Sequence, residues 1–140
     1  MPITTQNPDP IFVGTPKNWM AAINAANTDS SGAGALVTLV TAGAAEYIRI
    51  DEATVVNAQI TPVASTAMII HFFVDRGGTI THVREVPLPA ATRTNSTVGA
   101  TVNTVFTDLI LEPNDILKVS QSMHAGAQDL NHVTAFGGVY

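Results

Sequence analysis

Apolar and polar residues alternate in short runs along most of this chain, and turn-forming residues separate the runs. A period of two residues is that of a β-strand with one buried face. The spacing predicts about eight strands. We expect them at residues 19–26, 35–41, 47–59, 66–75, 79–86, 98–111, 116–123 and 132–139. The pattern indicates an all-β protein, an antiparallel β-sandwich of jelly-roll-like design.

Two of these segments need comment. The first, NWMAAINAAN, contains good helix formers, so a helix over residues 19–26 is the main alternative to a strand. In the sixth, apolar side chains recur at even-numbered positions, and we expect them to face one side of the sheet. They are Val98, Ala100, Val102, Phe106 and Ile110.

The first 16 residues contain four prolines, at positions 2, 8, 10 and 16. Proline fixes φ and has no N–H to donate, so we expect an extended N-terminal arm over residues 1–14 and a single domain over residues 15–140. Either the arm is a frayed terminus or it lies across a neighbouring subunit. In the second case Ile11, Phe12 and Val13 are its anchors, and Trp19 is a further interface residue.

Hydrophobic residues make up 46% of the chain and charged residues only 12%. A surface this poor in charge is weakly repelled by other surfaces, which favours a protein that works in an assembly. The net charge is −5 and the six Lys and Arg residues are not clustered, so we expect no direct nucleic-acid binding. No apolar run reaches the ~18 residues of a membrane span, and the chain has no cysteine.

The sequence contains none of the GxSxG, HExxH, P-loop or CxxC motifs, so we expect no enzyme and no catalytic residues. The remaining candidates for chemistry are four histidines, at positions 71, 82, 124 and 132. Residues 71 and 82 flank the turn Asp-Arg-Gly-Gly. If Arg76-Gly77 forms the hairpin tip, His71 lies opposite His82. If Gly77-Gly78 forms it, His71 faces Arg84 and His82 faces Phe73.

Even the first register brings only two ligands together, whereas a catalytic zinc site usually has three protein ligands and a structural one four. We therefore interpret the two histidines as packing residues, and we expect no metal and no cofactor.

Three stretches suggest a family: LVTLVTAGAAEYIRIDE (residues 36–52), MIIHFFVDRGGTITHVREVPLPA (68–90) and LILEPNDILKVSQS (109–122). Together the order of these pieces resembles small virion proteins encoded in tailed-phage structural gene clusters. The matching positions are Val37-Thr38, Thr41-Ala42-Gly43, Arg49-Ile50-Asp51, Asp75, Arg84-Glu85-Val86-Pro87 and Leu111-Glu112-Pro113. The resemblance covers roughly residues 14–140 and consists of turn and strand patterns.

The resemblance implies a β-sandwich that decorates or cements a bacteriophage head. The expected location is the capsid surface of the virion, the expected partner is the major capsid protein, and the expected self-association is a homotrimer. Two alternatives stay open: a tail or fibre-base protein of the same virion, and a carbohydrate-binding module used for adsorption. The second needs an exposed aromatic residue for sugar stacking, and only 6% of the residues are aromatic. The residue inventory argues against a hydrolase.

Overall fold

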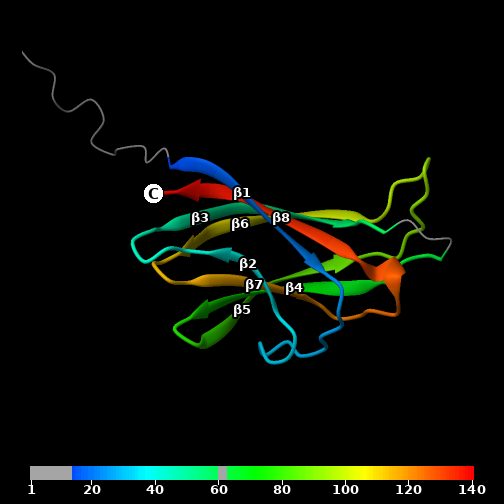
Figure 1. Cartoon of the computed structure of the whole chain (residues 1–140), viewed down its shortest axis with the longest axis horizontal. Coiled ribbons are helices and arrows are strands. Elements are labelled where there is room, and N and C mark those ends of the chain that lie inside the picture. Colours follow the sequence, from blue (N-terminus) through cyan, green and yellow to red (C-terminus); the bar gives the residue numbers. More distant parts are fainter. Residues whose placement is uncertain (1–13, 60–62) are drawn as a thin grey trace, which may run out of the picture.

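The computed structural model describes residues 14–59 and 63–140, and in them eight strands form two four-stranded antiparallel sheets. One sheet has the order β1-β8-β3-β6 and the other the order β2-β7-β4-β5, and Figure 1 shows them as two layers. The expected all-β sandwich is therefore confirmed. The strands are β1 (Thr15–Ile23), β2 (Val37–Thr41), β3 (Ile48–Asn57), β4 (Met68–Arg76), β5 (Thr79–Leu88), β6 (Thr101–Leu111), β7 (Ile116–Gln121) and β8 (Asn131–Val139).

The core lies between the two sheets and is built from alternate residues of both. Burying these apolar side chains provides most of the stabilisation of such a fold. The largest apolar side chains that are fully buried are those of Phe72, Phe73, Ile23, Ile48, Ile50, Ile70, Leu88, Leu111, Leu117, Val40 and Val55. Of these, all but Phe73 belong to the cluster between the sheets.

The first strand is real but begins earlier than expected, so the helical alternative for residues 19–26 is wrong. β1 already includes Pro16, whereas the alternation predicts the first strand only from residue 19. β1 lies at the end of its sheet and pairs with β8 alone. Proline is tolerated in an edge strand because its missing N–H can face away from the ladder. Residues 1–13, including Ile11, Phe12 and Val13, lie outside the described residues.

The expected single face of the sixth segment holds for Ala100, Val102 and Phe106 and is wrong for Val98 and Ile110. Val98 precedes the strand and is exposed, and Ile110 is half exposed, whereas the neighbouring Leu111 is fully buried. The pairing of β3 with β6 shifts between Ile50 and Glu52, and Asp108 there has a φ of 58°. This irregularity puts extra residues into β6 and exchanges the side-chain positions that face the core.

The outer face of the sheet β2-β7-β4-β5 is partly covered by the chain segment between β1 and β2. This segment, residues 24–36, runs beneath that sheet in Figure 1. At one end Asn27 N–H donates to the carbonyl oxygen of Gln121 on β7 at 2.7 Å. Further along, Gly32 lies so close to Ile80 of β5 that a side chain at Gly32 would overlap it. Coverage by residues 24–36 is consistent with the burial of outward-facing side chains such as Phe73.

Candidate functional site

Three side chains capable of binding a metal converge on the outer face of this second sheet: His71 of β4, and His82 and Glu85 of β5. We call them the His71–His82–Glu85 cluster. The strands β4 and β5 form a hairpin in which Arg76 pairs with Thr79, so Gly77-Gly78 is the tip. Both glycines have positive φ, 60° and 90°, as a two-residue type I′ turn requires.

A β-bulge places the three residues on one face. Near the tip His82 faces Phe73, as expected for a Gly77-Gly78 tip, but the pairing then shifts, so that Phe72 faces Arg84. Val83 is the extra residue. His71 consequently faces Glu85, and our expectation that it faces Arg84 is wrong. In a regular strand residues 82 and 85 project to opposite sides, and the bulge brings them to the same side.

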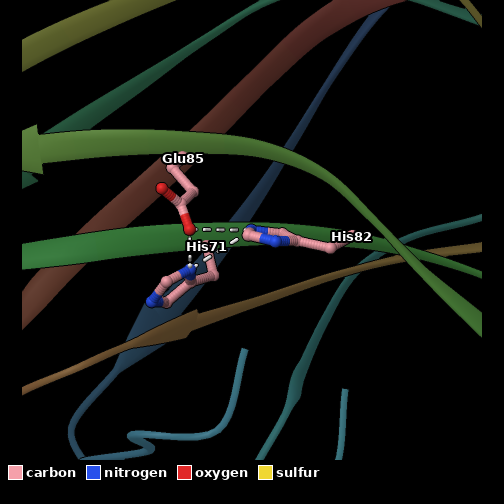
Figure 2. Close-up of side chains that lie close together, drawn as sticks. All are labelled: His71, His82 and Glu85. Carbon is pink, nitrogen blue, oxygen red and sulfur yellow. Dashed lines mark hydrogen bonds and ion pairs between the residues drawn. The ribbon is translucent and has the colours of Figure 1, made fainter. Parts of the chain in front are cut away.

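The ligand atoms of the cluster lie within contact distance of one another. His71 Nδ1 is 3.2 Å from His82 Nε2 and 3.6 Å from Glu85 Oε1, and His82 Nε2 is 3.8 Å from Glu85 Oε1. Figure 2 shows the three groups pointing toward a common centre. The expectation of no metal rested on the lack of a third ligand, and the structure provides one in Glu85.

The three side chains differ in their exposure to solvent. The side chain of His71 is 6% exposed, that of His82 25% and that of Glu85 55%. Burial lowers the pKa of His71, the neighbouring His82 lowers it further, and Glu85 partly opposes both. The His71 ring is therefore neutral at neutral pH. A ligand can approach from the side of Glu85.

A buried hydroxyl lies beside the cluster but does not complete a nucleophilic site. Ser120 of β7 is the residue directly opposite His71, so both side chains project from the same face. Its Oγ is fully buried and has no hydrogen-bond partner among the described residues. A nucleophile needs both a hydrogen-bonded base and access to substrate, and Ser120 lacks both.

The opposite outer face of the sandwich, on the sheet β1-β8-β3-β6, is different in character. The register aligns outward-facing residues in four rows that cross all four strands. One row, Pro16-Gly138-Arg49-Ile110, carries the Arg49–Asp51 ion pair. The other three are Asn18-Phe136-Glu52-Val105, Met20-Thr134-Thr54-Asn103 and Ala22-His132-Val56-Thr101. None of these twelve residues is buried, and Glu52 is the one carboxylate among them. We call these twelve residues the row face.

Large apolar side chains on the row face point into solvent. Met20 is 74% exposed and Val105 64% exposed. An open depression runs along the first row, where Asn18, Glu52, Val105 and Phe136 are among its lining residues. A four-stranded sheet face with so little charge and such exposed apolar groups has the composition of a protein interface.

Trp19 and the two remaining histidines, which the sequence analysis singled out, lie away from the cluster. Trp19 lies on the core-facing side of β1, half-buried against the core, with Lys17 Nζ 5.9 Å from its ring centre. Its role at an interface stays a prediction. Of the other two histidines, His132 belongs to the row face, and His124 follows β7 and lies near Gln121. Neither joins the His71–His82–Glu85 cluster.

Sequence reasoning missed Glu85 as a partner of His82 because it assumed regular alternation along residues 79–86. The one available signal is the spacing His-x-x-Glu, which only a bulge turns into a shared face.

No protein-family model and no curated protein matches the chain. In the described part of the chain no helix has the length and apolar character needed to cross a membrane.

Proposed function

We propose that this protein is a structural component of a bacteriophage particle and that it acts by protein–protein contact rather than by catalysis. The row face carries this proposal. Its twelve outward residues lie in register over four strands with a single carboxylate, and they include the highly exposed Met20. The twelve residues combine seven polar side chains with five apolar ones and include no Lys or Arg. This favours contact with another protein, because interfaces are depleted of charged residues at their centre.

The occupant we propose for the row face is a second copy of this chain, in a closed homotrimer. A surface that is poor in charge lacks the repulsion that keeps identical copies apart. With strands ~4.8 Å apart and residues ~3.4 Å apart, the three rows cover roughly 350 Å² in projection. A stable interface needs about 800 Å² per partner, so neighbouring segments must contribute the rest.

The second part of the proposal is attachment to the major capsid protein at the capsid surface. Residues 1–14, with Ile11, Phe12 and Val13, stay the predicted arm for this contact. The support is the resemblance of residues 14–140 to small tailed-phage virion proteins, together with the sandwich architecture. We also propose a jelly-roll connection, because the strand orders β1-β8-β3-β6 and β2-β7-β4-β5 fit an eight-strand sandwich of two Greek keys. A tail or fibre-base position in the virion is the alternative.

The test of self-association is a charge placed in the centre of the row face. Met20→Lys puts an ammonium group beside Thr134, its partner on β8. We expect sedimentation equilibrium to show a trimer for the unchanged protein and a monomer for Met20→Lys, because burying an unpaired charge at an interface is costly. Val98→Lys is the matched control: Val98 is 85% exposed but lies outside the row face, so this variant should stay trimeric.

A monomeric unchanged protein at ~50 μM, where even weak interfaces are populated, refutes self-association. A Met20→Lys protein that stays trimeric places the interface elsewhere. For attachment, particles that lack the protein are mixed with the full chain or with a variant that lacks residues 1–13. We expect the truncated protein to keep its oligomer size and to bind the particles more weakly. Equal binding of both forms refutes the role of the arm.

A further inference from the structure

We propose that His71, His82 and Glu85 form a binding site for a divalent transition-metal ion, with zinc as the best fit. The inference goes beyond the proposed assembly function and does not depend on it, because the cluster and the row face lie on different sheets.

The distances between the three ligand atoms match a zinc site. The triangle formed by His71 Nδ1, His82 Nε2 and Glu85 Oε1 has sides of 3.2, 3.6 and 3.8 Å. A point near its centre lies about 2.1 Å from all three atoms, which is the usual length of Zn–N and Zn–O bonds. The sides are longer than the ~3 Å edge of an octahedral site with such bonds, so the triangle favours a tetrahedral ion. The spacing of the three ligand atoms already suits an ion.

The ligand types are those that zinc uses. Two imidazoles and one carboxylate are a known donor set of zinc sites that keep an open position. An ion binds the lone pair of a neutral imidazole, and the lowered pKa of His71 keeps its ring neutral at neutral pH. Binding through His71 Nδ1 requires the proton on Nε2, and the protein has only to select this tautomer.

The two histidine rings are held in place before any ion arrives. His71 is nearly fully buried on the central strand β4. The His82 ring stacks on Phe73 with 4.9 Å between the ring centres, and Phe73 is fully buried. The bulge at Val83 fixes Glu85 opposite His71. A preorganised site loses little conformational entropy when it binds its ligand.

The fourth position of the ion faces the solvent side, where Glu85 is half exposed. A water molecule can occupy it. The alternative to metal binding is a purely structural pair, in which one neutral ring donates a single hydrogen bond to the other across 3.2 Å. The two interpretations differ in one measurable property, the uptake of zinc.

The experiment uses the full chain without an affinity tag, stripped of metal with a chelator and then titrated with zinc against a chromophoric competitor. We expect one zinc ion per chain with a dissociation constant below ~10 μM. Bound Co²⁺ should show the strong visible absorption of tetrahedral cobalt. Glu85→Gln and His82→Gln should each weaken zinc binding at least tenfold. Glu85 is exposed enough that its replacement leaves the core intact, and circular dichroism checks this for both variants.

His124→Gln is the matched control, because it removes one imidazole from the chain and leaves the cluster complete. It should bind zinc as the unchanged protein does. Failure of the full chain to take up stoichiometric zinc overturns the proposal, and so does equal uptake by Glu85→Gln and His82→Gln. Loss of zinc binding in His124→Gln places the site elsewhere and overturns it as well.

Discussion

Replacing the buried carboxylate of Asp129 tests how the end of the sandwich is held together. Asp129 ends the short 3₁₀ helix η1 (Ala127–Asp129) and is fully buried. Its Oδ1 accepts a hydrogen bond from the backbone N–H of Thr66, and its Oδ2 accepts one from the N–H of Ala125, both at 2.6 Å. The carboxylate thus connects the segment before β4 to the loop after β7.

The magnitude follows from these two hydrogen bonds. A hydrogen bond to a charged group contributes about 1.5–3 kcal/mol, and truncation leaves its former partner unsatisfied. Asp129→Ala removes two such bonds, so we expect it to lower the free energy of unfolding by about 3–5 kcal/mol. A domain of this size is stable by roughly 5–15 kcal/mol in total, so the expected loss is about a fifth of that stability or more.

The assay is urea unfolding at pH 7, followed by Trp19 fluorescence and far-UV circular dichroism. Asp51→Ala is the control, because Asp51 is half exposed and pairs with Arg49 on the surface, where an ion pair contributes about 1 kcal/mol or less. If the free energy of unfolding falls with urea concentration at the same slope in both variants, they expose the same surface on unfolding. A loss below ~1 kcal/mol for Asp129→Ala refutes the reasoning.

The same substitution has a pH signature. Burial raises the pKa of Asp129, but the hydrogen bonds from Thr66 and Ala125 together with the nearby His124 lower it by more, so the net shift is downward from 3.8. A carboxyl group with a lowered pKa stabilises the folded state above the unfolded pKa, and this contribution disappears as the pH falls through the folded value. The difference between the unchanged protein and Asp129→Ala should therefore shrink below pH ~4.

Three further variants test other parts of the fold by the same unfolding assay. Gly137→Ala should cost about 1–3 kcal/mol or more, because a Cβ there overlaps the carbonyl oxygen of Arg49, and a variant as stable as the unchanged protein contradicts this contact. Asp115→Ala should cost about 1.5–3 kcal/mol, since it removes the buried carboxylate that accepts a hydrogen bond from the Glu112 N–H, whereas the half-exposed Arg76 keeps Glu112 as a partner. The lowered pKa of His71 predicts that, in the absence of metal, the free energy of unfolding falls as the pH drops below 6.5, because the unfolded chain then binds more protons than the folded one. His71→Gln should flatten this dependence.

The number and approximate positions of the strands could be predicted from alternation and turn residues alone, because both are local properties. The hairpin from residue 68 to 88 shows where local information ends. Gly77-Gly78 was one of two possible tips, and the positive φ of both glycines decides for it. The residue after the bulge at Val83 contacts the other sheet: the Arg84 guanidinium lies 5.5 Å from the Phe106 ring centre and donates to the Val105 carbonyl oxygen at 2.9 Å.

These long-range contacts are the reason that the metal-binding candidate was predicted only in part. The sequence placed His71 opposite His82 only for an Arg76-Gly77 tip, which the structure does not have. The approach of the two rings and of Glu85 depends on the register shift at Val83, which the sequence pattern does not reveal. The row face was anticipated as a low-charge surface from composition, yet its position was not, since composition does not say which side of a strand faces outward. Alternation in the sixth segment failed for a similar reason: the backbone at Asp108 leaves the regular strand where β3 and β6 change register.

The placement of the two candidate surfaces makes their independence testable. Packed sheets lie ~10 Å apart, so the cluster and the row face are separated by at least that distance, and effects at sites so far apart without shared partners are usually additive. Met20→Lys should therefore leave zinc affinity unchanged, and Glu85→Gln should leave the oligomer size unchanged. If removal of zinc dissociates the oligomer instead, a neighbouring copy must supply a ligand to the open position beside Glu85. In that case the metal site remains, but the interface lies on the sheet β2-β7-β4-β5 and not on the row face. Sedimentation of Met20→Lys and Glu85→Gln, each with and without zinc, distinguishes the two positions of the interface.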